Sequence, residues 1–204
     1  MVPLLNEGTQ SASPELARAE VFSGTPQAAA LLLRDAVRSC ASQERPVQVA
    51  TAESLTGGDV GGAICTVPGA SAYYRGGVIS YAYEVKARVL GVDAQLLATE
   101  GAVNPEVAAQ MAAGAARVCG ADYAVSTTGV AGPDPADGQP VGTVFIGVHA
   151  PGGCEVFERH YDGDRARVRT AASADAIALL ARAVRGGGRL RLFEGDPLGP
   201  SPAA

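Results

Sequence analysis

Residues 47–58 of this 204-residue chain read VQVATAESLTGG, and this stretch decides the fold. Residues 47–52 form a short apolar run with β-branched side chains, which is typical of a buried strand. The Thr56-Gly57-Gly58 turn that follows predicts the start of a helix through about Cys65. A strand followed by a helix is the repeating unit of α/β folds.

The same alternation continues on both sides of this unit. Thr25-Pro26 reads as the start of a helix that extends to about Cys40. The remaining expected elements are a strand at 77–82, a short helix carrying Lys86, a helix at 106–118, a strand at 123–127, strands at 143–150 and 154–161, and a helix at 164–184. Pro151-Gly152-Gly153 predicts a hairpin between the last two strands, with His149 opposite Glu155 and His160 opposite Val144.

These elements predict a single-domain three-layer αβα sandwich with a mixed, mostly parallel sheet. The hydrophobic content of 47% is enough for a core without a disulfide or metal staple. The working domain is expected at 25–185. Residues 1–23 and 186–204 are expected to be flexible tails, because they mix Gly, Pro and polar residues without a sustained period.

Composition argues against several classes of function. The net charge of -5 and 18% charged residues give no basic surface for nucleic acid. No stretch approaches the roughly 20 apolar residues that span a bilayer, so we expect no membrane association and a cytoplasmic location. The four dispersed cysteines and the two histidines lack metal-ligand spacing, which predicts reduced cysteines and no metal site.

Lys86 is the chain's only lysine, because the other fifteen of its sixteen basic residues are arginine. A primary amine can lose its proton when it is desolvated, whereas a guanidinium effectively cannot. Lys86 is therefore a candidate general base. The alternative is an ordinary solvated lysine that escaped the arginine bias by chance.

Ser54 lies where the first strand turns into its helix, a place where backbone N–H groups converge. Such a turn can bind a phosphate or stabilise an oxyanion, and Gly57 and Gly58 would let a substrate approach the backbone. The alternative is a serine that merely caps the helix.

A second loop and an arginine pair complete the candidate site. Residues 129–134, GVAGPD, follow another buried strand and so belong to the ligand-binding edge of an α/β sheet, unless they form an ordinary turn. Arg165 and Arg169 are spaced one helical turn apart and can grip a phosphate, although a solvated helix face explains them as well.

Six segments together resemble one bacterial family. They are TAESLTGG (51–58), PGASAYYRGGVISYAYEVKARVLGV (68–92), GAVNPEVAAQMAAGAA (101–116), STTGVAGPD (126–134), PVGTV (140–144) and GDRARVR (163–169). In this order they are similar to the C-terminal domain of competence/damage-inducible proteins, the nicotinamide mononucleotide deamidases. Larger members carry a further N-terminal domain, so this chain resembles the stand-alone form.

The resemblance implies hydrolysis of the carboxamide of nicotinamide mononucleotide to nicotinic acid mononucleotide and ammonia, without a cofactor and with a small-molecule nucleotide as substrate. It also implies a homodimer. Ser54 matches the serine of the family's A-E-S-C-T-G-G motif, and we expect it to be the nucleophile. Tyr81 and Lys86 match the tyrosine and lysine of the Y-S-N-x-x-K motif, and we expect Lys86, assisted by Tyr81, to activate Ser54. The residues expected to contact substrate are Glu53, Thr56, Gly57, Gly58, Ser71, Thr128, Gly129, Gly132, Arg165 and Arg169.

Three positions depart from the family's pattern: Leu55 replaces a cysteine, Ala82-Tyr83 replace Ser-Asn, and Asn104 replaces a serine. None of these removes the proposed nucleophile or base. Two rival functions follow from the same residues, namely a nucleotide-binding module without catalysis and a serine amidase with a different substrate.

Overall fold

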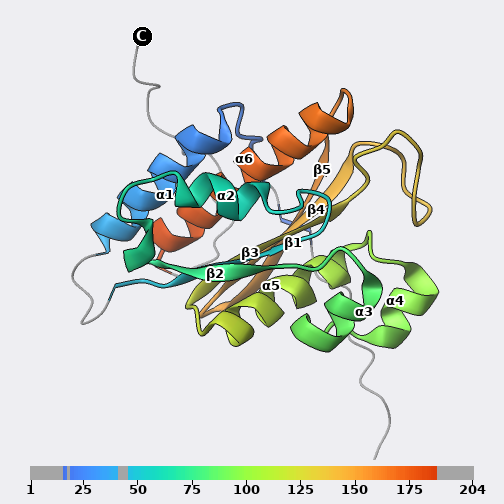
Figure 1. Ribbon diagram of the computed structural model, residues 1–204, viewed down its shortest axis with the longest axis horizontal. Helices are drawn as coiled ribbons and strands as arrows, with labels where there is room; N and C mark the ends of the chain where they lie inside the picture. The colour runs from blue at the N-terminus through green and yellow to red at the C-terminus, as the bar shows by residue number, and fades with distance from the viewer. Residues whose placement is uncertain (1–15, 18, 41–45, 188–204) are drawn as a thin grey trace, which may run out of the picture.

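The computed structural model describes residues 16–17, 19–40 and 46–187, which form a five-stranded sheet between helices (Figure 1). The order across the sheet is β2-β1-β3-β4-β5. The strands are β1 (Val49–Glu53), β2 (Tyr74–Ile79), β3 (Tyr123–Gly129), β4 (Thr143–Ala150) and β5 (Gly153–His160). β1 is parallel to β2 and β3, whereas β4 is antiparallel to β3 and β5. All strands except β4 therefore share one direction, as expected for a mixed, mostly parallel sheet.

Helices cover both faces of the sheet (Figure 1). On one face lie α1 (Pro26–Ser39), α2 (Asp59–Cys65) and α6 (Arg165–Arg185). On the other lie α3 (Tyr83–Val85), the π-helical turn η2 (Lys86–Leu90), α4 (Ala94–Glu100) and α5 (Pro105–Cys119). Successive residues of β1 point to opposite faces of the sheet. Val49 packs in the core between the sheet and the α1 and α6 helices, and Ala50 packs in the core between the sheet and α5. The three-layer αβα sandwich is confirmed.

Four of the described helices, α1, α4, α5 and α6, begin where short polar side chains cap them. Thr25 Oγ1 accepts from the N–H of Ala28 (3.1 Å) before Pro26 starts α1. Asn104 Oδ1 accepts from Val107 in the same way before Pro105 starts α5, and Asp164 Oδ1 accepts from Arg167 at the start of α6. Each cap satisfies an N–H that has no partner within its helix.

α6 is the longest of the described helices and packs along α1 over the sheet. Its inner residues, among them Val168, Ile177 and Leu180, are fully buried. Within the described residues, no helix is both long and apolar enough to cross a membrane.

The packed body begins before the expected boundary at residue 23. Leu16 forms a parallel bridge with Val156 of β5, and the N–H of Ala17 donates to the Val156 carbonyl (2.8 Å). Phe22 packs against the α1–α6 core, and its N–H donates to Asp175 (3.1 Å). Residues 16–17 and 19–23 are thus part of the domain, and the rest of the expected N-terminal tail and residues 188–204 lie outside the described residues.

Two elements differ from the expected pattern. β2 covers Tyr74–Ile79 rather than 77–82, because the apolar run continues beyond the point where the chain leaves the sheet. α4 was not expected at all. It has seven residues, too few for a helical period to stand out, and it follows Asp93, its N-cap, whose carboxylate accepts from the N–H of Gln95 (2.7 Å).

The hairpin register was predicted one residue off. Ala150 pairs with Gly153, so the turn has two residues rather than three. His149 therefore lies opposite Cys154 instead of Glu155, and His160 lies opposite Thr143 instead of Val144. A one-residue change in turn length shifts every pair along a hairpin.

Candidate active site

The carboxyl ends of three parallel strands meet at one edge of the sheet, the usual ligand-binding edge of open α/β sheets. Ser54 follows β1 directly and lies between the other two strand ends. Its N–H donates to the carbonyl of Thr127 in β3 (2.9 Å), and Ser80, after β2, donates its N–H to the carbonyl of Glu53 (2.8 Å). The backbone around the half-buried Ser54 is therefore held from both sides.

Lys86 reaches Ser54 from the first residue of the π-helical turn. Its Nζ lies 2.9 Å from Ser54 Oγ, and it also donates to the carbonyls of Ser80 (2.6 Å) and Tyr81 (3.3 Å). The residue is only 1% exposed, the largest fully buried side chain of those described. The structure thus brings together two residues that are 32 positions apart in the sequence.

Burial lowers the pKa of Lys86 to about 8, and the negative charge of Asp137 offsets part of that effect. A lysine with its ordinary pKa would be almost wholly protonated near neutrality. Here a substantial neutral fraction exists at mildly alkaline pH. The neutral amine can accept the Ser54 proton across the same short distance, so the pair is arranged for base-assisted nucleophilic attack.

Glu53 builds the turn after β1 and is 2% exposed. Its carboxylate accepts from the N–H groups of Gly58 (2.8 Å), Val60 (3.1 Å) and Gly61 (2.8 Å). It also accepts from the hydroxyl of Thr56 (2.7 Å), which lies 2.8 Å from Thr127 Oγ1. Glu53 therefore occupies the anion-binding positions at the start of α2. The expectation that Glu53 holds substrate is corrected, because its carboxylate is used within the protein. The Thr56 hydroxyl is used in the same way, whereas the Thr56 N–H has no acceptor among the described residues.

Of the N–H groups from Thr56 to Gly58, where we expect an oxyanion to bind, those of Gly57 and Gly58 are already used within the turn. Gly57 and Gly58 have φ values of 62° and 109°, which only glycine adopts readily, and they serve to shape the turn. The N–H of Gly57 donates to the Ser54 carbonyl (3.1 Å). Among the described residues, the N–H groups of Leu55 and Thr56 have no acceptor. These two groups follow Ser54 directly in sequence and are available to an oxyanion.

The loop after β3 reaches the site mainly through Gly132. Its carbonyl accepts from Arg165 Nη1 (2.9 Å). Thr128 is buried and donates its hydroxyl to the carbonyl of Ala102 (2.6 Å), so it does not offer that group to a substrate as expected. A Cβ at Gly129 would lie 2.5 Å from the Thr143 carbonyl oxygen, which makes this glycine a requirement of strand pairing.

Tyr81 and the two arginines border the site. Arg165 Nη2 donates to the hydroxyl of Tyr81 (3.0 Å), whose side chain is largely exposed. Arg169 Nη2 donates to the carbonyl of Thr56 and to Asp59 Oδ2 (2.8 Å each). The Tyr81 hydroxyl thus faces Arg165, and only its backbone carbonyl contacts Lys86.

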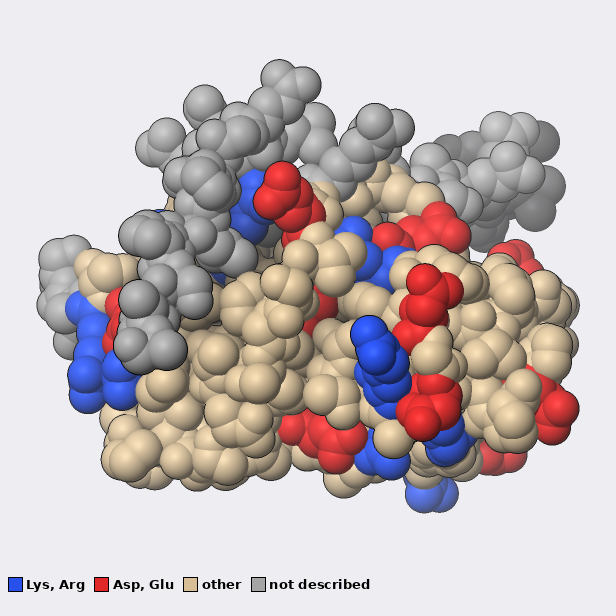
Figure 2. All heavy atoms as spheres, turned by 90° about the horizontal axis from the view of Figure 1, so that it is seen from above, with Lys and Arg blue, Asp and Glu red and all other residues tan. Residues whose placement is uncertain are grey.

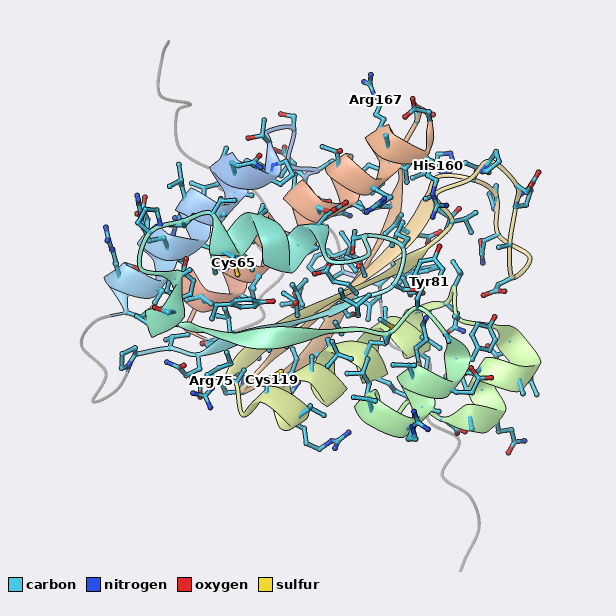
Figure 3. The ribbon with its side chains drawn as sticks, viewed as in Figure 1. Cys65, Arg75, Tyr81, Cys119, His160 and Arg167 are labelled. Carbon is cyan, nitrogen blue, oxygen red and sulfur yellow. The ribbon has the colours of Figure 1, made fainter. Side chains whose placement is uncertain are left out.

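The figures show how these groups are spread over the molecule. Tyr81 lies at the end of the sheet near α3, while Arg167 points away from the sheet at the start of α6 (Figure 3). On the face seen in Figure 2, basic residues lie beside acidic ones rather than in one continuous basic area. Arg169 and Asp59 form an ion pair in which Arg169 Nη2 lies 2.8 Å from Asp59 Oδ2.

Ser71 lies away from this site, which corrects its expected role in substrate binding. It is exposed on the 3₁₀ turn η1 (Ala70–Ala72), which precedes β2, whereas the site lies after the end of β2. Cys65, which ends α2 just before this turn, lies at the opposite end of the sheet from Tyr81 (Figure 3). The full length of β2 separates Ser71 from the edge of the sheet that carries Ser54 and Lys86.

The described residues hold no group of three or more His, Cys, Asp and Glu side chains that could bind a metal ion. All four cysteines are free thiols. Burial lowers the pKa of His149, which favours its neutral form.

Three residues near the site were not among the expected ones. Asp59 pairs with Arg169, and Tyr83 donates its hydroxyl to Asp137 (2.9 Å). The sequence carried a weak signal for two of them: Tyr83 departs from the family pattern, and Asp137-Gly138 is a turn dipeptide. Nothing local indicated that Asp137 and Tyr83 would meet.

Fold and site together define a class: a three-layer α/β protein with a serine and a buried lysine at the carboxyl edge of its sheet. Residues 33–184 match the CinA C-terminal domain. The chain therefore belongs to the CinA C-terminal domain family.

Relatives and solved structures agree with this assignment. A CinA-like protein of Frankia casuarinae is 50% identical over 143 residues, 70% of this chain and 33% of that protein. One from Geobacter metallireducens is 44% identical over 69% of this chain and 34% of its own length. The chain thus spans about a third of the length of these curated relatives.

Among solved structures, a CinA superfamily protein from Klebsiella pneumoniae has a TM-score of 0.74 at 30% identity. The match covers 80% of this chain and 99% of that one. A competence/damage-inducible protein from Agrobacterium tumefaciens has a TM-score of 0.71 at 33% identity, covering 81% of this chain and 99% of that one. These similarities support the α/β fold.

Proposed function

We propose that this chain is a nicotinamide-nucleotide amidase, which hydrolyses the carboxamide of nicotinamide mononucleotide to nicotinic acid mononucleotide and ammonia. The observation that carries the proposal is the 2.9 Å contact between Ser54 Oγ and Nζ of a buried Lys86. The choice of substrate rests on the family resemblance of the segments around these residues.

The first half of the reaction makes an ester. Neutral Lys86 takes the hydroxyl proton of Ser54 while Oγ attacks the carboxamide carbon, which gives a tetrahedral oxyanion beside the N–H groups of Leu55 and Thr56. The C–N bond then breaks, the amide nitrogen takes the proton from the Lys86 ammonium, and ammonia leaves.

The second half restores the enzyme. Lys86 removes a proton from water, and the resulting hydroxide attacks the nicotinoyl ester carbon. The C–Oγ bond breaks, Ser54 Oγ takes the proton back from Lys86, and the carboxylic acid ionises as it leaves. Tyr81 contributes by orienting Arg165 at the edge of the site and not as a proton carrier, since its hydroxyl lies on that guanidinium and only its backbone carbonyl contacts Lys86.

A panel of amides tests the proposal. Ammonia release is measured with nicotinamide mononucleotide, nicotinamide riboside, free nicotinamide and glutamine. We expect the highest kcat/KM with the mononucleotide. Faster release from another amide would indicate a serine amidase of different substrate. Mononucleotide binding without ammonia release from any of the four would indicate a nucleotide-binding module.

The two arginines are expected to behave differently when replaced. Arg165 is exposed and anchored at the edge of the site, which suits a phosphate ligand, whereas Arg169 is already held by Thr56 and Asp59. Arg165→Ala should raise KM for the mononucleotide by roughly 10-fold, the equivalent of one charge-assisted hydrogen bond. It should leave the kinetics of the riboside, which lacks the phosphate, nearly unchanged.

Arg169→Ala serves as the comparison, because it loosens the turn that carries Ser54. It should lower kcat/KM for mononucleotide and riboside by similar factors. Equal losses on both substrates in Arg165→Ala would contradict its assignment to the phosphate.

A further inference from the structure

The side chain of Lys86 folds back onto the segment that leaves β2. Its Nζ donates to the carbonyls of Ser80 (2.6 Å) and Tyr81 (3.3 Å), which lie 6 and 5 positions earlier in the chain, and to Ser54 Oγ (2.9 Å). A protonated lysine has three N–H donors and no acceptor. The three acceptors therefore match the three donors of the ammonium.

The neutral amine has two N–H groups and one lone pair, so one of these contacts must change when the proton leaves. The two carbonyls can only accept a hydrogen bond, whereas the Ser54 hydroxyl can accept or donate one. Every group keeps a partner in just one arrangement, in which both N–H groups stay on the carbonyls and the lone pair accepts from the hydroxyl. Any other arrangement leaves a buried polar group of the fully buried Lys86 pair unsatisfied, which costs free energy.

The two carbonyls are held in place by the backbone around them. The N–H of Ser80 donates to the carbonyl of Glu53 in β1 (2.8 Å), and the N–H of Lys86 donates to the carbonyl of Ala82 at the start of α3 (3.2 Å). The Ser80 hydroxyl is buried and has no hydrogen-bond partner among the described residues, so Ser80 acts through its backbone. The sequence could not indicate Ser80 as a site residue, because every residue type carries the same carbonyl.

The charged and titratable groups around Lys86 lie outside this set of contacts. Asp137, in the loop between β3 and β4, offsets part of the effect of burial on the pKa of Lys86. The carboxylate of Glu53 is turned to the N–H groups at the start of α2, and the hydroxyl of Tyr81 faces Arg165. Within the described part of the chain, Nζ therefore has one serine hydroxyl and two backbone carbonyls as hydrogen-bond partners.

We propose that the carbonyls of Ser80 and Tyr81 position the neutral amine of Lys86, so that its lone pair points at the Ser54 hydroxyl. Ser80 and Tyr81 are thus positioning residues, which act on Ser54 through Lys86. The same carbonyls stabilise the ammonium after the proton has moved, because charged donors form the stronger hydrogen bonds. The effect on turnover rests on the proposed amidase function, whereas the effect on the protonation of Lys86 does not.

Amide-to-ester exchange tests this role, because an ester carbonyl is a weaker hydrogen-bond acceptor than an amide carbonyl. The α-hydroxy acid analogue of tyrosine at position 81 turns the peptide bond after Ser80 into an ester and weakens the Ser80 carbonyl. The same analogue at position 83 is the matched control, because it weakens the carbonyl of Ala82, which accepts from the backbone N–H of Lys86 instead of Nζ. The N–H groups of Tyr81 and Tyr83, which the exchange removes, have no acceptor among the described residues.

The protonation of Lys86 can be measured without a substrate, because it is the chain's only lysine. Protein labelled with ¹³C at lysine Cε gives one lysine signal, whose chemical shift is followed against pH. We expect a midpoint near 8 in the wild type, the pKa to which burial lowers Lys86. The ester at position 81 should lower this midpoint by roughly half a pH unit, since it weakens a bond to the ammonium. The ester at position 83 should leave it unchanged.

Turnover gives the second measurement. Well above the midpoint Lys86 is neutral, so kcat there no longer depends on its protonation and reports how well the lone pair is aimed. The ester at position 81 should lower this alkaline plateau of kcat several-fold, and the ester at position 83 should not. If the Ser80 carbonyl only stabilised the ammonium, the midpoint would fall while the plateau stayed at the wild-type level, and this result would overturn the proposal.

Replacing Ala82 with lactic acid weakens the Tyr81 carbonyl and provides a second variant, should the ester at position 81 prevent folding. This contact is longer, 3.3 Å against 2.6 Å, so we expect a smaller fall of the midpoint in the same direction. An unchanged midpoint in the folded variants with an ester at position 81 or 82, or an equal fall in the position 83 control, would also overturn the proposal. Midpoints that shift as expected in a protein that releases no ammonia would contradict only the amidase function.

Discussion

Ser54→Ala should lower ammonia release from nicotinamide mononucleotide by roughly 10³-fold or more, because the atom that forms the ester is gone. The fold should remain, since the change removes one oxygen from a half-buried turn whose backbone is held by Thr127 and Glu53. Steady-state kinetics and the midpoint of thermal unfolding measure the two effects separately.

Ser71→Ala is the matched control for this variant. The family resemblance implied a role for Ser71, but the structure places it at the far end of β2. The substitution should leave kcat and KM unchanged within about twofold. Ammonia release near the wild-type rate from Ser54→Ala would remove Ser54 from the role of nucleophile.

The fold could be predicted from sequence where the pattern is local. The apolar run at residues 47–52 and the glycines after it specify a strand and its turn, and Thr25-Pro26 specifies a helix start. α4 was missed because seven residues hold no readable period. The register of the β4–β5 hairpin was missed because a Pro-Gly-Gly sequence is compatible with turns of two or three residues.

The site could be predicted in its residues better than in its contacts. Lys86 could be predicted as a site residue because it is the chain's only lysine. Only the tertiary structure shows that its amine reaches Ser54. Glu53 illustrates the limit. A carboxylate directly before Ser54 suggests a substrate ligand, but the turn folds back so that three N–H groups bind it. Tyr83 and Asp137 meet across 54 positions, a distance that no local pattern encodes.

The rate of the wild-type enzyme should rise with pH through about 8, the pKa to which burial lowers Lys86. The sign follows from the chemistry, because only the neutral amine can accept the Ser54 proton. Below this range the ammonium predominates and donates to Ser54 instead. The profile of kcat/KM between pH 6 and 10 measures this limb, and a flat profile there would contradict Lys86 as the base.

Lys86→Arg should reduce activity by roughly 10²-fold or more, nearly as much as Lys86→Ala, since a guanidinium keeps the charge but cannot give up its proton. If Lys86 only supplied positive charge, the arginine variant should retain most of its activity, as fifteen other cationic positions of this chain are arginine. Arg88→Lys, the reverse exchange at an exposed position of the same helical turn, should be nearly neutral and controls for the swap itself. Thermal unfolding of Lys86→Arg shows whether the larger buried cation is tolerated. A folded Lys86→Arg enzyme with near wild-type turnover, and with no alkaline limb at a pH near 8, would rule out the Ser–Lys chemistry and leave Ser54 to be activated by another group.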